Sequence, residues 1–490
     1  MPDTEVRITK PTQRSTEGVT WRKNKPLEKG LATEAVVPSS PTIADEYDVI
    51  VIGAGFSGLV ADRDLRSTAS TLLVEARDRI GGRTWVAKVD GEDVELGGRF
   101  VHWHQPHLYN ETIRYGKRKY IKSLPHPTGP PDYHFTTNNH TTTIDPLTTA
   151  SKLEKFYKDF VSVNDTTPEA FLHPPPPLRE TRRHQMDVSP QDRPLFEAAL
   201  QMFGLDRPEE TGFLNVARYI ASSDSGTKLL EKGGTYSLGG GGTTALARSI
   251  LAEFTGGVLF RSPVVGISQD GADGRVRVTT RDGRTVLARY VVNTMPLNVL
   301  STITFSPPLS GFEREVVERG HVGRGGKVIL ALEDGNVPRP FFASAATSAI
   351  TSSSGCDFVA SFHKAISPTD GSVIRAVGFL ALSTESPDLT TEASSEKILR
   401  SYEALVPEAK VEEYSVHDWR SDPFARGTWA CLPAGFGDGK YWDELRRGHG
   451  NVVMASGDWA VGWRGFIDGA VEQGVIAAQR VKGLLRGVKV

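Results

Sequence analysis

The sequence is poor in cysteine and holds no long apolar run. Its 490 residues include two cysteines, Cys356 and Cys431, which excludes a disulfide framework or a thiolate metal cluster and fits a reducing compartment. A membrane-spanning helix needs about 20 consecutive apolar residues, and no such run occurs. The N-terminus lacks the apolar core of a signal peptide, and the chain does not end in a peroxisomal Ser-Lys-Leu tripeptide. We therefore expect a cytoplasmic protein with no membrane partner.

Charge of one sign is not in excess either. The 57 Lys and Arg residues nearly balance the 59 Asp and Glu residues, so no basic surplus points to a nucleic-acid partner. The composition, 38% hydrophobic and 24% charged, is ordinary for a globular protein. A chain of this length is too long for one compact core, so we expect two domains, which can be interleaved.

Residues 1–45 show no hydrophobic periodicity. They are rich in Pro, Ser, Thr, Lys and Glu, a composition typical of segments that do not bury a core of their own. We expect a flexible arm, mostly extended or disordered, in front of the folded chain.

The clearest pattern begins directly after this arm. The apolar run Val49–Ile52 is rich in β-branched residues and ends at a glycine, as a buried parallel strand does. A GxGxxG motif leads into a helix over about 59–66; its glycines permit a tight turn, approach of a pyrophosphate and close packing of helix on strand. The helix N-terminus directs N–H groups at the phosphates. The residues of this loop that we expect at the cofactor are Gly53, Gly55, Phe56, Ser57 and Gly58.

An acidic residue stands at the end of the next strand. That strand, Leu72–Val74, ends at Glu75, where a carboxylate about twenty residues after the glycines can accept hydrogen bonds from the ribose of an adenosine. GxGxxG alone is weak evidence, because glycine-rich turns before helices are common. Strand, glycines, helix, strand and acid in this order predict a dinucleotide-binding domain.

The residues after the acid indicate which dinucleotide binds. Ala76 and Arg77 follow directly, and Gly81, Gly82 and Arg83 come shortly after. The glycines bring the backbone close to a cofactor, and Arg83 can neutralise pyrophosphate charge with its planar guanidinium. A basic surface turn is the alternative. The spacing resembles the second half of the FAD fingerprint in the flavin amine oxidase superfamily.

A second glycine pair, Gly97-Gly98, precedes Arg99 and a group of histidines. A glycine pair after a strand lets the backbone lie against a flat group. His102, His104 and His107 suggest a zinc site, but no carboxylate or cysteine completes it with convincing spacing. We expect these histidines to be packed or hydrogen-bonded beside the cofactor.

The end of the chain again shows a strand, a glycine and a helix. A strand over 451–455 leads to Gly457 and Asp458, and a glycine-rich turn enters a helix that continues to about Leu485. Asp458 can accept hydrogen bonds from the ribityl hydroxyls of a flavin. The helix N-terminus at Phe466 and Ile467 can face the flavin or its phosphates.

Four segments together are similar to the flavin monoamine oxidases, most closely to the soluble fungal members. They are EARDRIGGRTW from Glu75, GRFVHWHQPH from Gly98, DPFARGTWACLPAG from Asp422, and the block from Gly457 to Gly474. With Lys327, the resemblance spans nearly the whole chain after the arm. It implies an α/β fold in which a Rossmann-like FAD-binding domain is interleaved with a substrate-binding domain.

The resemblance also implies an activity. In that family an amine passes a hydride from its α-carbon to flavin N5, the imine is released and hydrolysed, and dioxygen reoxidises the flavin to give hydrogen peroxide. Lys327 matches the lysine that holds a water against N5, while Trp429 and Phe466 match the two aromatics that flank the amine. Without the resemblance, Lys327 would be a solvated lysine beside a strand, and either aromatic would be ordinary core.

The stretches between the cofactor motifs differ in character. The first is helical and irregular and holds no chemical motif, and the second mixes strands with a helix. Between them strands resume, with a hairpin turn at Asp282-Gly283, and Val265 stands where such flavoproteins clamp the adenine with backbone groups. We therefore expect an arm at 1–45, FAD-binding segments at 46–105, 227–296 and 418–490, and substrate-binding segments at 106–226 and 297–417.

The sequence departs from the family at three places. In the membrane-bound animal enzymes a cysteine beside the first cage aromatic bonds the flavin; Thr428 takes that place here, so we expect FAD to be held non-covalently. Their C-terminal membrane helix has no counterpart. Arg99 stands where a small residue is usual, which leaves the shape of the wall beside the ring open.

Several functions stay open. An amino-acid oxidase would need an Arg in the pocket and a polyamine oxidase an acidic channel, and a flavin desaturase of a specialised metabolite is a further alternative. A flavin-binding module without turnover has no use for Lys327 and the two aromatics. The expected partners are a small-molecule amine and dioxygen. The sequence names neither the amine nor the oligomeric state, a homodimer included.

Overall fold

The computed structural model describes most of the chain. The described residues are 13–123, 132–137, 140–161, 188–205, 210–222, 236–271, 274–333, 341–345, 357–366, 373–382, 386–433 and 439–488. Cys356 lies outside these ranges.

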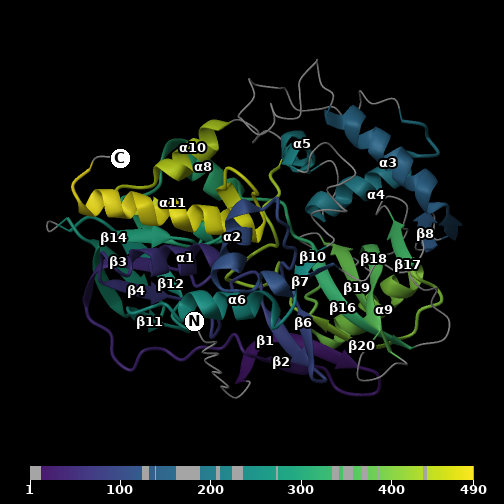
Figure 1. The fold of residues 1–490 in the computed structure, drawn as a ribbon, viewed down its shortest axis with the longest axis horizontal. Helices are drawn as coiled ribbons and strands as arrows, with labels where there is room; N and C mark the ends of the chain where they lie inside the picture. The colour runs from purple at the N-terminus through teal and green to yellow at the C-terminus, as the bar shows by residue number, and fades with distance from the viewer. Residues whose placement is uncertain are drawn as a thin grey trace.

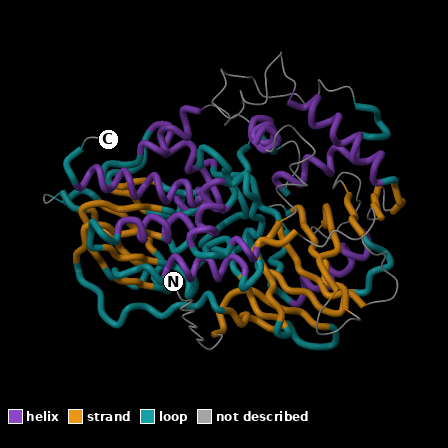
Figure 2. Tube along the Cα trace, in the orientation of Figure 1, coloured by secondary structure: helices purple, strands orange, loops and turns teal. Residues whose placement is uncertain are grey.

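Two large sheets lie side by side (Figures 1 and 2). The first has the strand order β11-β4-β3-β14-β13-β12-β15, with β21 pairing beside β14. β3 pairs in parallel with both β4 and β14, as predicted for a Rossmann-like domain. The strands of this sheet are β3 (Glu46–Ile52), β4 (Thr71–Val74), β11 (Gly257–Leu259), β12 (Val264–Ser268), β13 (Val276–Thr280), β14 (Thr285–Asn293), β15 (Thr304–Ser306) and β21 (Val452–Met454).

Helices cover the first sheet. They are α1 (Phe56–Leu65), α2 (Pro106–Arg114), α6 (Gly242–Leu251) and α11 (Ile467–Leu485), and Figure 1 shows α11 in yellow above β14. α1 contacts β3, α6 and α11. Leu59 of α1, Val51 of β3 and Ala477 of α11 belong to one buried apolar cluster, so the motif helix is held on several sides. The shorter elements near this sheet are α7 (Leu297–Leu300), α8 (Gly311–Arg319) and α10 (Gly439–Arg447).

Two glycines let α1 approach its neighbours. A Cβ on Gly58 would lie 1.8 Å from the carbonyl oxygen of Gly53, and a Cβ on Gly474 of α11 would lie 2.4 Å from the carbonyl oxygen of Ser57. Real Cβ atoms do not come this close, so any side chain would push the helix away. The third glycine of GxGxxG therefore has the close-packing role that the sequence predicted.

The second sheet is larger and mostly antiparallel. Its strand order is β6-β5-β2-β1-β20-β16-β19-β18-β17-β8-β9. α4 and α9 contact β17 and β18. The strands are β1 (Gln13–Arg22), β2 (Glu28–Thr33), β5 (Val86–Val89), β6 (Glu92–Glu95), β8 (Asp132–Thr137), β9 (His140–Ile144), β16 (Gly326–Glu333), β17 (Phe341–Ala345), β18 (Asp357–Ile366), β19 (Val373–Ala381) and β20 (Val411–Val416). Its helices are α3 (Pro146–Val161), α4 (Arg193–Gly204), α5 (Phe213–Ser222) and α9 (Glu392–Leu405), and β7 (Ile121–Ser123) pairs with β10 (Tyr236–Leu238) in a small separate sheet.

The N-terminal segment differs from the expected flexible arm. β1 pairs with β2 and, almost four hundred residues away in sequence, with β20, where Val19 lies opposite Val416. Ser15, Val19 and Thr20 are buried. The strand was missed because it lacks an alternating apolar pattern, and its partner β20 is distant in the sequence.

The two sheets exchange strands inside the expected domain segments. β5 and β6, within 46–105, belong to the second sheet, whereas β15, within 297–417, belongs to the first. The chain therefore does not pass from one sheet to the other at the expected domain boundaries. The division into domains remains a prediction. None of the helices among the described residues is long and apolar enough to cross a membrane.

The close contact between Gly58 and Gly53 can be tested by its effect on stability. Gly58→Ala should lower the free energy of unfolding by about 1–3 kcal/mol, because the added methyl group overlaps the Gly53 carbonyl. Gly266→Ala on β12 is the matched control, since the nearest atoms to its Cβ lie 3.8 Å away. Chemical denaturation followed by circular dichroism measures both. Equal effects of the two substitutions would contradict the close-packing role.

Candidate active site

A cavity of about 690 Å³ lies where the two sheets meet. Its wall includes the glycine-rich loop after β3 and residues of β16, β17, β18 and β19. Most of the residues that the sequence placed at a cofactor or in catalysis line it; Gly58 and Asp458 do not. The predicted residues in the wall are Gly53, Gly55, Phe56, Ser57, Glu75, Ala76, Arg77, Gly82, Arg83, Gly97, Gly98, Arg99, Val265, Lys327, Trp429, Gly457, Phe466 and Ile467.

One end of the cavity has the features of a dinucleotide site. Oε2 of Glu75 accepts a hydrogen bond from the backbone N–H of Ala54 at 2.6 Å, and Oε1 accepts from that of Arg77 at 2.9 Å. The carboxylate thus ties its own loop to the glycine-rich loop and keeps further lone pairs for a ribose. A Cβ on Gly82 would lie 3.2 Å from Cα of Gly55, so two bare backbone segments meet here. No side chain caps the N-terminus of α1, which leaves its N–H groups for phosphate.

Asp458 lies behind Arg83 rather than in the cavity wall. Its Oδ1 is 2.5 Å from Nη2 of Arg83, and its Oδ2 accepts from the backbone N–H of Leu297 at 2.8 Å. Burial favours the neutral acid, but Arg83, followed by His321, outweighs burial and holds the pKa of Asp458 below its usual range. Nη1 of Arg83 donates to the carbonyl of Thr428 at 2.6 Å. Asp458 therefore orients the guanidinium that faces the cavity.

Lys327 is buried in the cavity wall. It is 6% exposed, so it is not the solvated lysine that a position at the head of β16 would suggest. Its Nζ donates to the carbonyl of Gly97 at 2.7 Å. A Cβ on Gly97 would lie 2.1 Å from the carbonyl of Arg83. Because Gly97 has no side chain, the carbonyl that binds Lys327 lies close to the backbone of Arg83.

Glu95 is a half-buried acid near Lys327 that the sequence did not single out. Burial raises its pKa, while Lys327 and Arg99 act in the opposite direction. Its Oε1 accepts from the N–H of Trp85 at 2.9 Å and its Oε2 from the hydroxyl of Thr243 at 2.6 Å. The signal that could have found it is its place at the end of β6, two residues before the glycine pair.

Trp429 and Phe466 both line the cavity. The indole Nε1 of Trp429 donates to the carbonyl of Phe203 at 2.6 Å, which fixes the ring plane. Phe466 makes edge contacts with Tyr219 and Trp463, at centroid distances of 5.7 and 5.1 Å. Burial raises the pKa of Tyr219, so its phenol stays neutral.

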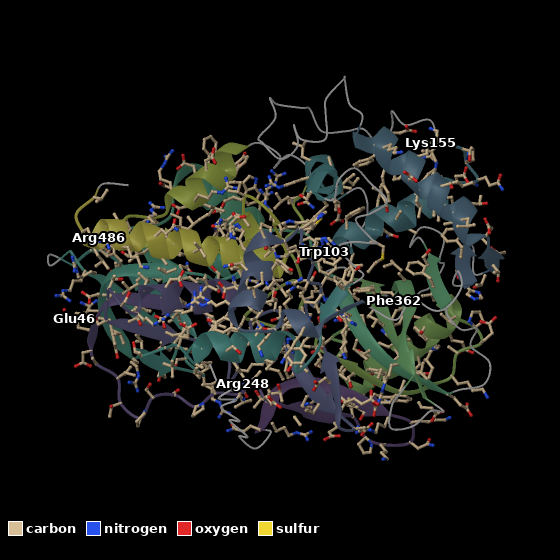
Figure 3. All side chains as sticks on the ribbon, in the orientation of Figure 1. Glu46, Trp103, Lys155, Arg248, Phe362 and Arg486 are labelled. Carbon is tan, nitrogen blue, oxygen red and sulfur yellow. The ribbon has the colours of Figure 1, made fainter. Side chains whose placement is uncertain are left out.

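The wall beside Trp429 and Phe466 is largely apolar. Phe362 of β18, labelled in Figure 3, is one of its aromatic side chains. The sequence did not reveal this wall, because an aromatic residue on a strand is equally typical of a hydrophobic core. The residues of the wall also come from separate strands and helices. The wall residues in question are Met202, Phe203, Tyr219, Phe342, Phe362 and Phe379.

Arg99 is a buried cation with few partners. It is 7% exposed, and its Nη2 donates to the hydroxyl of Ser237 at 3.2 Å. Its Nε is buried and has no hydrogen-bond partner among the described protein atoms. Burial lowers its pKa to about 10, with Glu95 opposing the shift. The site thus holds a donor that an oxygen of a bound molecule can satisfy.

Neither Thr428 nor Cys431 offers a bond to a ring. Thr428 lines the cavity, and its buried hydroxyl has no partner among the described atoms. Cys431 is fully buried outside the cavity wall, and its sulfur accepts from the side-chain amide of Asn215 at 3.2 Å. This placement agrees with a cofactor held without a covalent bond.

The histidines after Gly98 do not form a metal site with other ligands among the described residues. Nδ1 of His102 accepts from the backbone N–H of His104 at 3.0 Å, and the His102 ring packs 5.6 Å from Tyr236. The one cluster of metal-ligating types among the described residues is Glu17, His417 and Asp422, far from them in sequence. His102 is packed and hydrogen-bonded as expected, whereas His104 is exposed and none of the three histidines lines the cavity.

Comparisons with known proteins agree with this geometry. Pseudooxynicotine dehydrogenase of Pseudomonas sp. is 30% identical over 474 residues, covering 94% of this chain and 90% of the relative. (S)-6-hydroxynicotine oxidase of Paenarthrobacter nicotinovorans is 26% identical and covers 89% and 99%. Among solved structures, cyclohexylamine oxidase from Brevibacterium oxydans superposes with a TM-score of 0.67 at 21% identity, over 90% of this chain and 99% of that one, which supports the fold alone.

A family model assigns nearly the whole folded chain. The model described as "Flavin containing amine oxidoreductase" matches residues 56–482, from the first residue of α1 to near the end of α11. This range includes the second glycine pair, Lys327 and the C-terminal block. The chain belongs to the flavin-containing amine oxidoreductases, which use FAD to oxidise amines.

Proposed function

We propose that this flavin amine oxidoreductase is a monoamine oxidase that uses dioxygen. The observation that carries the proposal is a cavity whose wall contains both the dinucleotide loops and Lys327, Trp429 and Phe466. Bound FAD would supply the hydride acceptor, and dioxygen would take up the two electrons to give hydrogen peroxide.

The residues present fit FAD. The glycine-rich loop and the uncapped N-terminus of α1 would hold the pyrophosphate, with Arg83 neutralising its charge. Glu75 would take the adenosine ribose, and backbone groups at Val265 would border the adenine. Asp458 would act on the cofactor through Arg83, to which it is ion-paired.

The apolar end of the cavity would select an uncharged amine. Trp429 and Phe466 line the cavity with several phenylalanines, and such a wall would exclude water when a substrate is bound. Exclusion of water favours the neutral amine, whose lone pair is needed to release the hydride, and two flanking rings orient its α C–H bond. Lys327, anchored on the carbonyl of Gly97, would keep a water between its ammonium group and the reacting edge of the ring.

A screen of amines tests this function. Purified protein should form hydrogen peroxide with primary, secondary or tertiary monoamines, and nicotine and pseudooxynicotine belong in the panel because relatives are named for them. Reduction of an artificial dye should be measured in parallel, since two of these relatives are named dehydrogenases. Dye reduction without peroxide would contradict the oxidase, and no turnover with any amine would contradict both.

One observation favours an amino-acid oxidase as the second candidate. Arg99 is a buried guanidinium in the cavity wall with an unpartnered Nε, and such a group can bind a carboxylate. The screen should therefore pair each amine with its α-carboxylated counterpart. A monoamine oxidase should prefer the amine. A preference for the amino acid that is lost in Arg99→Met would establish the alternative.

Replacing Lys327 tests the ring end of the site. Lys327→Met keeps the length of the side chain but removes the ammonium group, so turnover should fall at least tenfold, about 1.4 kcal/mol in activation free energy. Reoxidation by dioxygen should be the slowed step, which stopped-flow measurement of the two half-reactions can separate. Lys410→Met is the control, because that side chain is 63% exposed and lies outside the cavity wall. A variant that keeps the wild-type rate would remove Lys327 from the chemistry.

The mode of FAD binding has its own test. Acid precipitation of the holoenzyme should release all the flavin into the supernatant, because Thr428 cannot form a thioether and the sulfur of Cys431 is buried outside the cavity wall. Flavin absorbance of pellet and supernatant measures the partition. Colour that stays in the pellet of the wild type and leaves it in Cys431→Ser would show a covalent bond.

A further inference from the structure

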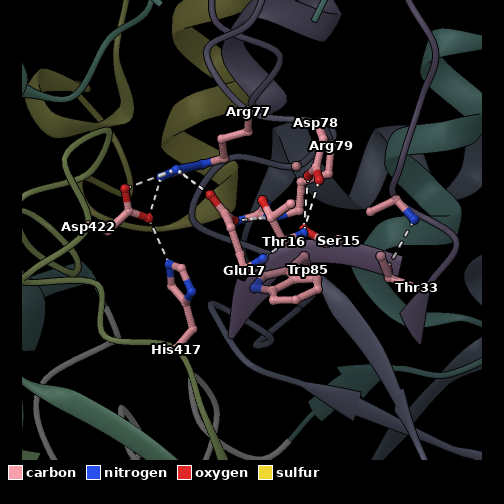
Figure 4. Close-up of polar contacts among 12 residues, drawn as sticks. Ser15, Thr16, Glu17, Thr33, Arg77, Asp78, Arg79, Trp85, His417 and Asp422 are labelled. Carbon is pink, nitrogen blue, oxygen red and sulfur yellow. Dashed lines mark hydrogen bonds and ion pairs between the residues drawn. The ribbon is translucent and has the colours of Figure 1, made fainter. Parts of the chain in front are cut away.

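Glu17 connects the N-terminal strand to the loop that follows Glu75. It lies on β1 of the second sheet, whereas Arg77 and Arg79 follow β4 of the first sheet. Its Oε1 is 3.0 Å from Nη1 of Arg77, and its Oε2 is 2.7 Å from Nε of Arg79 (Figure 4). One carboxylate thus bridges both arginines, with a separate oxygen for each.

The bridge lies among buried charges. The side chains of Arg77 and Arg79 are 2% and 0% exposed. Asp422 pairs with Arg77 at 2.8 Å and accepts from His417 at 2.7 Å, so two carboxylates balance two guanidinium groups. Burial acts to raise the pKa of Glu17, but Arg77 and Arg79 outweigh it and lower that pKa. Removing the Glu17 charge would leave a buried positive charge without its partner.

The two arginines also contact the cofactor loops directly. The backbone N–H of Arg77 donates to Glu75, and Nη1 of Arg79 donates to the carbonyl of Gly82 at 2.8 Å. Glu75 and Gly82 both line the cavity. Glu17 is therefore linked through Arg77 to Glu75, the acid expected to bind the ribose. Through Arg79 it is linked to Gly82, the glycine that lies against Gly55.

A second tie joins β1 to the same loop. The hydroxyl of Ser15 donates to Oδ1 of Asp78 at 2.9 Å, and the backbone N–H of Thr16 donates to Oδ2 at 3.1 Å. Ser15 and Asp78 are buried. Strand β1 thus holds three consecutive residues of the loop, from Arg77 to Arg79.

The cluster of Glu17, His417 and Asp422 is not a metal site. These residues could offer three ligand atoms to a cation. However, both oxygens of Glu17 and both oxygens of Asp422 already contact arginine nitrogens. A divalent cation would have to displace two buried guanidinium groups, whose charge also repels it.

We propose that Glu17 is a positioning residue for the adenosine end of FAD. Through Arg77 and Arg79 it fixes the backbone that presents Glu75 and Gly82, so the N-terminal strand of the second sheet completes the cofactor site of the first. The inference rests on FAD as the cofactor and does not depend on which amine is oxidised.

The release of FAD from the holoenzyme tests this role. Glu17→Gln should release FAD at least tenfold faster than the wild type, followed by flavin fluorescence after dilution. Glu17→Asp keeps the charge on a shorter side chain, so its rate of FAD release should lie between those of the wild type and Glu17→Gln. Glu28→Gln on the adjacent strand β2 is the matched control, because Glu28 also bridges two arginines, Arg14 and Arg22, but is 46% exposed. It should release FAD at the wild-type rate.

Circular dichroism during the same heating ramp separates positioning from general stability. In Glu17→Gln the temperature of flavin release should fall further than the temperature of unfolding. If Glu17→Gln releases FAD at the wild-type rate, or if the Glu17 and Glu28 substitutions have equal effects, the proposal is overturned. If Glu17→Gln does not fold, Ser15→Ala decides: several-fold faster release supports the proposal, and the wild-type rate overturns it. A wild-type protein without FAD would instead contradict the cofactor.

Discussion

The structure at the centre of this molecule depends on close contacts between backbone segments that have no side chain between them. A Cβ on Gly97 would overlap the carbonyl of Arg83, and a Cβ on Gly323 would lie 2.0 Å from the carbonyl of Trp429. The contact between Gly58 and Gly53 joins the motif helix to the turn before it, whereas the contact between Gly323 and Trp429 joins segments that are far apart in the sequence. Such contacts leave little freedom, so the wall of a cavity that must hold a long, flat cofactor is preorganised before the cofactor binds.

Buried charge pairs add a second constraint at the same place. Arg83 pairs with Asp458, and Arg77 pairs with Glu17 and Asp422. Because burial of two charges costs desolvation, such pairs are weak evidence for stability, but each one fixes the geometry of its partners. Here each pair joins a cofactor loop to a distant part of the chain. These pairs therefore fix the cofactor loops to distant segments, while other buried pairs, such as Arg63 with Glu111, lie outside the cavity wall.

The sequence predicted those parts of the structure whose causes are local. The strand, glycines and helix from Val49 onward were predictable, because periodicity and glycine spacing lie within one short stretch. The pairing of β1 with β20 was not, since nothing near residue 19 shows which distant strand will take it. The aromatic wall from β17, β18 and β19 was missed for the same reason: its residues become neighbours only when antiparallel strands find their register.

Asp458 and Lys327 show what a motif can and cannot carry over. Both were placed in the site by motif and resemblance, but only Lys327 lines the cavity, because a motif gives the position of a side chain and not its partner. Lys327 is held by a backbone carbonyl at the cavity wall, whereas Asp458 is turned away from the cavity toward Arg83. A buried carboxylate beside a guanidinium is bound by the nearest opposite charge. The partner therefore depends on the fold of the whole chain, and a role read from the motif alone stays a hypothesis until that partner is known.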